Sequence, residues 1–173
     1  MIYCTACSRH KHTKSQPIGY GRSAKATNPA PADVLFVFGQ PYKYEAVAGA
    51  GTGEVPRLLK LAIERSMLLS RVKFTWYATY LVRCPAPNTE NDDSVGEDVV
   101  WACNPLFEEV RVSVKPRATV FVGKHLLRMV PKEMRRHWIL DIDYVEYRGG
   151  VEAPEYRTVC RQLVDIAKGL DIA

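Results

Sequence analysis

Four short segments of the chain are almost entirely apolar or are rich in β-branched and aromatic residues. Runs of this kind are typical of strands buried in a sheet that is covered on both faces. The second of them stops at the sequence Cys84-Pro-Ala-Pro, which gives that strand a sharp end. We therefore expect four strands, at residues 33–39, 73–83, 118–123 and 138–147.

Between and after these segments the apolar residues recur at helical spacing. A glycine-rich loop at 48–53 is followed by Pro56, at a position that the first turn of a helix tolerates. The apolar residues that continue this helix are Leu58, Leu59, Ala62 and Ile63. Residues 155–170 have the pattern of an amphipathic C-terminal helix, and Cys160 falls on its apolar face, so we interpret Cys160 as a core residue.

A further helix is expected to carry Cys103. Residues 94–97 (SVGE) match a capping box at its start. Pro105 is expected to bend or restart this helix and Pro116 to close it.

Strands that alternate with helices define an α/β fold, and we expect a three-layer sandwich with a four-stranded, mainly parallel sheet flanked by helices. A chain of 173 residues fits one domain, spanning 1–173. In such folds ligands gather at the carboxyl ends of the strands, which here are residues 39–42, 84–87 and 123–125.

Composition excludes several classes of protein. A hydrophobic content of 47% and a charged content of 25% are those of a globular protein rather than a disordered one. The chain has neither an apolar run long enough for a bilayer nor the apolar stretch of a signal peptide at its N-terminus, so we expect a cytoplasmic protein without a membrane partner. Five cysteines, an odd number, then favour metal ligation over disulfides.

The formal net charge of +5 favours a polyanionic partner, of which DNA is the first candidate. The excess is concentrated in the first 25 residues, which contain no acid. The candidate DNA-binding residues are Arg9, Lys11, Lys14, Arg22 and Lys25, together with Lys43 and Lys124 at strand ends.

Four of the cysteines form two separated pairs. Cys4 and Cys7 have the CxxC spacing that brings two thiolates to one metal centre, while Cys84 and Cys103 flank a single loop. This set suits either tetrahedral zinc or an iron-sulfur cluster, and the spacing does not choose between them.

In several segments the chain resembles the iron-sulfur uracil-DNA glycosylases of families 4 and 5. The similar segments are CTAC (4–7) followed by His10-Lys11, VLFVFGQP (34–41), the strand into Cys84, and ACNPLFEEVRVSVKPRATVFVG (102–123). They occur in order over most of residues 4–130, and the C-terminal quarter matches weakly. The resemblance implies a uracil-DNA glycosylase-like fold, a 4Fe-4S cluster bound by Cys4, Cys7, Cys84 and Cys103, and a DNA partner from which a nucleotide is flipped into a pocket.

The resemblance also shows where this chain departs from the family. An alignment on Pro41 places Gly39, beside Gln40, where the family has the acid that positions water. Gly51 stands where a phenylalanine stacks on the base, and Tyr80 replaces the asparagine that reads uracil. No His-Pro pair exists near the C-terminus, where Arg148 is the only residue that could stabilise an anion. The base-pocket equivalents are therefore Gly39, Gln40, Pro41, Gly51 and Tyr80.

Three functions remain open at this stage. The first is a DNA-binding 4Fe-4S protein that has lost the uracil chemistry and acts as an accessory in replication or repair, with a polymerase or another replication or repair protein as a further partner. The second is an active DNA glycosylase with altered residues or substrate, in which Gln40 or Glu45 would position water and His125 or Arg148 would stabilise the leaving base. The third is a zinc-stabilised protein-interaction module.

Overall fold

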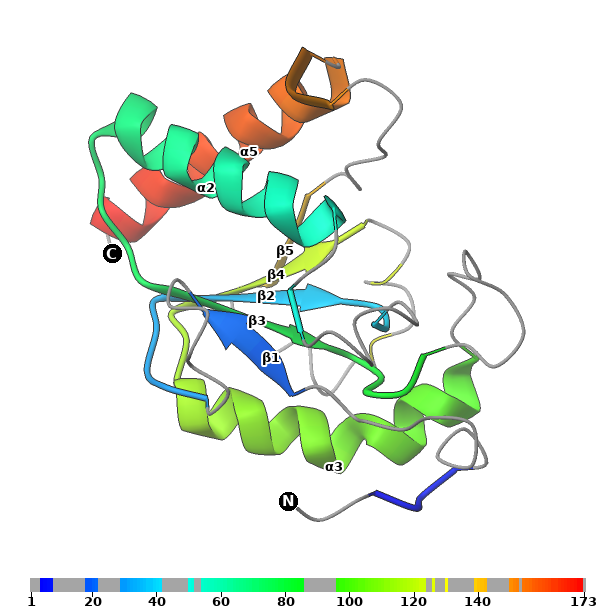
Figure 1. The fold of residues 1–173 in the computed structure, drawn as a ribbon. Helices are drawn as coiled ribbons and strands as arrows, with labels where there is room; N and C mark the ends of the chain where they lie inside the picture. The colour runs from blue at the N-terminus through cyan, green and yellow to red at the C-terminus, as the bar shows by residue number, and fades with distance from the viewer. Residues whose placement is uncertain are drawn as a thin grey trace.

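The computed structural model describes residues 4–7, 18–21, 29–41, 50–51, 54–85, 96–123, 126, 130, 139–142, 150–152 and 154–172. The elements are, in chain order, β1 (Gly19–Gly21), β2 (Val34–Phe38), α2 (Glu54–Ser70), β3 (Trp76–Tyr80), α3 (Glu97–Val114), β4 (Ala118–Val122), β5 (Ile139–Ile142), the short 3-10 helix η3 (Gly150–Glu152) and α5 (Pro154–Ile172). Helices α2 and α5 cover one face of the sheet and α3 covers the other (Figure 1).

The five strands form one mixed sheet in the order β1-β3-β2-β4-β5. Strand β2 pairs in parallel with β3 and β4, and β4 pairs in parallel with β5, whereas β1 runs antiparallel to β3. The α/β class is confirmed. The four expected strands are present as β2 to β5, and the expected strand count is corrected by a fifth strand, β1, at one edge.

Strand β1 can lie close against β3 because its first residue, Gly19, has no side chain. A Cβ atom on Gly19 would lie 2.2 Å from the carbonyl oxygen of Ala78 on β3, a distance that no side chain tolerates. The hydroxyl of Thr79 donates a hydrogen bond of 2.6 Å to the carbonyl oxygen of Ile18 and holds the start of β1 against β3. Glycine therefore permits the close approach that β1 makes to β3.

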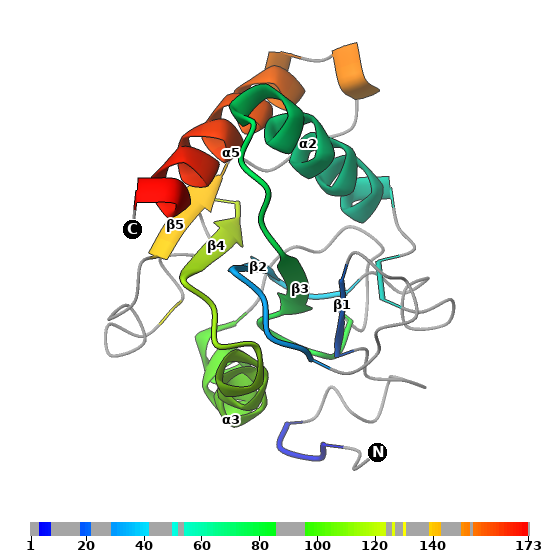
Figure 2. The ribbon, with the colours of Figure 1, turned by 90° about the vertical axis from the view of Figure 1, so that its left-hand side faces the viewer.

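The alternation of side chains along β2 divides the core into two layers. Val34, Phe36 and Phe38 pack with α2 and α5, while Leu35 and Val37 pack with α3. All five are buried, which is why the strand reads as a continuous apolar run. Each such side chain contributes about 1.5–3 kcal/mol when fully buried. Figure 2 shows the two layers from the side, with α2 and α5 on one side of the strands and α3 on the other.

The helix patterns are borne out for α2 and α5. Leu58, Leu59, Ala62 and Ile63 are at most 1% exposed, and Cys160 is buried in the core cluster, as its position on the apolar face predicts.

The structure contradicts the expected capping box at the start of α3 and the expected restart of this helix at Pro105. The helix begins at Glu97 after an N-cap at Gly96, which makes no side-chain capping bond, so it lacks the expected capping box. Pro105 lies inside one continuous helix and does not restart it, because buried side chains before and after it hold the same face of α3 on the sheet. These are Val100, Cys103, Phe107, Val110 and Val114.

The end of α3 is sharp. Lys115 adopts a left-handed conformation with φ of 49°, and its N–H donates to the carbonyl oxygen of Arg111 over 2.9 Å. Pro116 follows and prevents the helix from continuing, as expected. No helix within the described ranges combines the length and the apolar character needed to cross a membrane.

At the amino end of the sheet, Asp33 joins the start of β2 to the segment before β3. One carboxylate oxygen of Asp33 accepts hydrogen bonds from both the backbone N–H and the hydroxyl of Thr75, each over 2.7 Å. The backbone N–H of Asp33 donates in return to the Thr75 hydroxyl over 3.0 Å. Burial raises the pKa of Asp33, but the hydrogen bonds from Thr75 and the charge of Arg117 outweigh it, so the pKa lies below its ordinary value.

Candidate functional site

The parallel strands end together at one edge of the sheet, and their pairing continues beyond the strand ends. The N–H of Leu81 donates to the carbonyl oxygen of Phe38 over 2.7 Å, and that of Val82 donates to Gly39 over 2.9 Å. These bonds hold the backbone directly before Gln40 against the backbone directly before Arg83 and Cys84. The pairing of the two strands thus extends to the edge of the sheet where ligands gather in folds of this class.

Aromatic side chains occupy the region around Gly51. The N–H of Gly51 donates to the phenol oxygen of Tyr80 over 3.4 Å, and Tyr80 is only 1% exposed. Three atoms of the Tyr20 ring lie within 2.8 Å of the point where a Cβ atom on Gly51 would stand. Phe38 continues the group, with ring centroids 6.4 Å from Tyr20 and 6.1 Å from Tyr80. A stacking ring at position 51 would therefore have to displace Tyr20.

The segment that directly follows β2 has no acidic side chain at residues 39–41. Gly39 and Gln40 are half-buried at the end of β2, and Pro41 behind them is buried. Neither Gly39 nor Gln40 has a carboxylate, so neither can accept a proton from water as the carboxylate of an aspartate or glutamate in that position would. Of the weaker catalytic candidates, Glu45, His125 and Arg148 lie outside the described residues.

The candidate DNA-binding residues also lie outside the described part of the chain. They are Arg9, Lys11, Lys14, Arg22, Lys25, Lys43 and Lys124. Their assignment rests on the sequence.

The four candidate ligand cysteines come from three separate parts of the chain. Cys84 follows β3 and Cys103 lies in the second turn of α3, and both are buried, at 3% and 2% exposure. Cys4 and Cys7 are half-buried, and none of the cysteines is in a disulfide. In both views of the ribbon the segment 4–7 lies beside α3 (Figures 1 and 2).

The pKa of the Cys103 thiol depends on burial and on the neighbouring thiols. Burial raises the pKa of the Cys103 thiol, a backbone hydrogen bond from Arg83 lowers it, and the nearby Cys7 and Cys4 raise it further. The N–H of Ala6 donates to the sulfur of Cys4 over 3.4 Å. N–H donors of this kind are part of the surroundings that tune iron-sulfur clusters, so the donor set and its hydrogen bonds suit a thiolate-bound metal centre.

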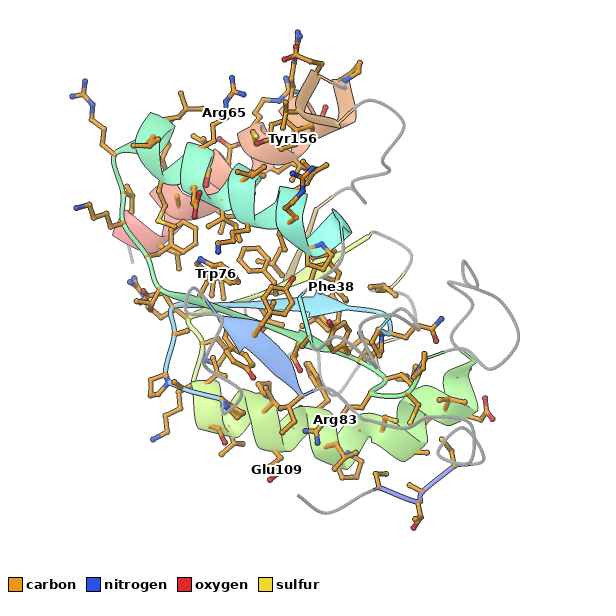
Figure 3. All side chains as sticks on the ribbon, viewed as in Figure 1. Phe38, Arg65, Trp76, Arg83, Glu109 and Tyr156 are labelled. Carbon is orange, nitrogen blue, oxygen red and sulfur yellow. The ribbon has the colours of Figure 1, made fainter. Side chains whose placement is uncertain are left out.

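Arg83 connects the strand that leads to Cys84 with the helix that carries Cys103. Its guanidinium donates a hydrogen bond of 2.9 Å to the carbonyl oxygen of Leu106. Burial lowers the pKa of Arg83, and the charges of Glu109 and of the nearby thiols oppose this. Figure 3 shows Arg83 and Glu109 on the same side of the sheet as α3. Sequence analysis did not select Arg83, although a cation that ends an apolar strand directly before a candidate ligand was a usable signal.

The described cysteine side chains do not lie close enough together to form a set of metal ligands. Within the described residues, no group of three or more histidine, cysteine, aspartate or glutamate side chains is arranged closely enough to hold a metal ion. The cysteines thus have the type of donor and the environment that a metal centre needs, but they do not form an assembled set of ligands.

Comparison with known proteins supports a relationship to one superfamily. No protein-family model matches the chain. Over 132 residues the chain is 27% identical to a type-4 uracil-DNA glycosylase of Saccharolobus solfataricus (strain ATCC 35092 / DSM 1617 / JCM 11322 / P2). The match covers 76% of this chain and 56% of that protein, so the chain spans little more than half the length of this relative. Together with the α/β fold, this similarity supports a uracil-DNA glycosylase-like superfamily relationship.

Proposed function

We propose that this chain is a DNA-binding protein of the uracil-DNA glycosylase-like fold that holds a 4Fe-4S cluster and does not release uracil. In this proposal it acts as an accessory in DNA replication or repair. The similarity to a type-4 uracil-DNA glycosylase supports the fold and the DNA partner. The absence of uracil release is inferred from Gly39, Gly51 and Tyr80, which stand where the family has its catalytic and base-binding residues.

One observation carries the non-catalytic part of the proposal. The backbone at Gly51 is held between the phenol of Tyr80 and the ring of Tyr20. A flipped base needs a stacking surface and a polar group that reads its edge, and buried aromatic rings here occupy the positions of both. Gln40 at the end of β2 supplies no carboxylate for water.

Cys4, Cys7, Cys84 and Cys103 are the residues that would hold the cluster. A bound cluster would cross-link the N-terminal segment to β3 and α3, a structural role in a chain whose first 25 residues carry five lysines and arginines and no acid. Its chemistry there is thiolate ligation of iron. Arg83, the residue before Cys84, is hydrogen-bonded to the backbone of α3, and this contact favours the approach of the Cys84 and Cys103 thiols.

The DNA partner can be tested through salt. Each phosphate that a lysine or arginine neutralises adds about 0.9 to the slope of log affinity against log salt on B-DNA. We expect the full chain to bind a fluorescein-labelled 30-mer duplex with a steep slope, and a Lys11→Gln/Lys14→Gln variant to lose about 2 from that slope. Glu108→Gln, a change at a partly exposed residue of α3, is the control. An affinity that does not vary with salt would contradict DNA binding.

Gln40 at the carboxyl end of β2 keeps a second candidate function open, a glycosylase that acts on another damaged base. In that case Gln40 or Glu45 would position water and His125 or Arg148 would stabilise the leaving base. A single-turnover screen of oxidised, alkylated and deaminated bases in duplex DNA separates the two. Product from any of them, lost in the Gln40→Ala or Arg148→Ala variant, would favour the enzyme.

A further inference from the structure

Helix α2 exposes large apolar side chains on the face that points away from the sheet. Leu68 is 80% exposed, Leu69 63% and Leu61 38%. Residues 61, 65, 68 and 69 share one face of a helix, so these leucines form a stripe that contains Arg65. Val151, which is 41% exposed, lies just before α5. Four of the six exposed large apolar residues in the described part of the chain are therefore on or beside the α2 and α5 layer.

A groove lies between α2 and α5 next to this stripe. Its volume is about 300 Å³, and its lining residues are Arg65, Leu69, Tyr156, Arg157, Cys160, Arg161 and Val164. Tyr156 and Cys160 form a buried floor, at 2% and 5% exposure. The three arginines are exposed around it, and Figure 3 shows Arg65 and Tyr156 together at this surface.

The groove combines three arginines with an apolar floor. None of its described lining residues is acidic, and Arg157 makes only a long contact of 3.9 Å with Glu152, with both side chains well exposed. Burial raises the pKa of the Cys160 thiol, which therefore stays protonated and adds no negative charge. Three cations surround an apolar surface that water solvates poorly.

We propose that the α2–α5 groove, with the stripe of Leu61, Leu68 and Leu69, is a docking site for an acidic amphipathic helix of a partner protein. Apolar side chains of the partner would cover the leucines and the groove floor, and its carboxylates would pair with the arginines. A DNA backbone could pair with the arginines but would leave the leucines in water.

The location makes this site independent of the proposed function. The groove is on the α2 and α5 side of the sheet, whereas Cys103 is on α3 and Arg83 lies beside α3 on the other side (Figures 1 and 3). A partner could therefore dock here while the other side of the molecule binds DNA. Failure of DNA binding would not affect this proposal.

A library of random 16-residue peptides displayed on phage, selected against the full chain, tests the proposal. Selected peptides should carry Asp or Glu around Leu, Ile or Phe at spacings of three and four residues. A selected peptide, made synthetically and labelled with fluorescein, should bind at least about tenfold more weakly to Leu68→Ser/Leu69→Ser and to Arg157→Glu/Arg161→Glu. These side chains are exposed, so the variants should keep the wild-type circular dichroism spectrum.

The matched control is Trp101→Ser/Val112→Ser, which changes two exposed apolar residues on α3 and should leave peptide binding unchanged. Selection of basic peptides, or equal binding to all variants, would overturn the proposal. A tenfold loss of DNA affinity in Arg157→Glu/Arg161→Glu without peptide selection would assign the groove to nucleic acid instead. A wild-type dimer that becomes a monomer in Leu68→Ser/Leu69→Ser would assign it to a second copy of the chain.

Discussion

The backbone N–H of Gly51 donates a hydrogen bond to the phenol oxygen of Tyr80, with 3.4 Å between the two atoms. This contact joins the loop before α2 to the last residue of β3. It is made where the resemblance to the iron-sulfur glycosylases places a stacking ring and a base-reading amide. The two replacements thus contact each other, and a change at one of them alone would not restore an open pocket.

Removing the Tyr80 oxygen should weaken the fold. Tyr80→Phe deletes the acceptor of this bond and should lower the free energy of unfolding by about 1 kcal/mol. Tyr77→Phe is the matched control, because the Tyr77 oxygen is buried with no hydrogen-bond partner in the described part of the chain. It should be neutral or stabilising. Urea denaturation measures both, and a larger loss in Tyr77→Phe than in Tyr80→Phe would contradict the described packing.

Gly51 should not accept a side chain. Its φ of 76° is strained for other residues, and the nearest atom of the Tyr20 ring would lie 2.6 Å from a new Cβ atom. Gly51→Ala should therefore cost about 1–3 kcal/mol of unfolding free energy. At Gly21 a Cβ atom would meet its neighbours at 3.5 Å or more, an ordinary contact, so Gly21→Ala is the control. Equal stability of the two variants would show that Tyr20 does not lie against Gly51.

The contact between Asp33 and Thr75 should make stability depend on acid pH. Because the pKa of Asp33 is lowered in the folded protein, its contribution is present in full above the unfolded value near 3.8 and is lost as pH falls through the folded value. Asp33→Asn should cost about 1–2 kcal/mol at pH 7, and the difference from wild type should narrow below pH 3.8.

The control for Asp33 is Glu108, which pairs with Arg111 on α3 over 2.6 Å but is partly exposed. Glu108→Gln should cost only about 0.2–0.5 kcal/mol. Denaturation curves at pH 7 and pH 3 compare the two. If the loss of unfolding free energy in Asp33→Asn became larger as pH falls, the prediction would be contradicted.

The cysteines divide into ligands and one core residue. Protein purified without oxygen should be brown, with absorbance near 400 nm and bound iron. Cys84→Ser and Cys103→Ser should each lose most of that iron, whereas Cys160→Ala, on the opposite side of the sheet, should keep it. A colourless wild-type protein that contains zinc would instead support the zinc-stabilised interaction module.

Much of the sheet could be predicted because strands buried on both faces have a distinctive apolar pattern. Val34–Phe38 and Ala118–Val122 are examples, and each lies inside its expected segment. Strand β1 could not be predicted, because Gly19 and Gly21 have low strand propensity and the strand exists through its pairing with β3, about 60 residues away. The path of α3 through Pro105 likewise depends on tertiary packing.

The candidate site was predicted unevenly for a similar reason. Cys84, Cys103 and Tyr80 could be selected because each lies in a segment with a recognisable pattern. The position of Tyr20 against Gly51 depends on the pairing of β1 with β3, so nothing local to Tyr20 in the sequence indicates it. The place of Arg83 directly before Cys84 was a usable signal, but its bond to the backbone carbonyl of Leu106 on α3 could not be predicted, because every residue has such a carbonyl.

Uracil release by the full chain, loaded with iron and in excess over single- and double-stranded DNA that contains one uracil, tests the central claim most directly. The account predicts no abasic product above the level of a protein-free control after hours of incubation, under conditions in which the same preparation binds the DNA. Stoichiometric release of uracil would contradict it, and would show that residues other than those at positions 39, 51 and 80 perform the chemistry.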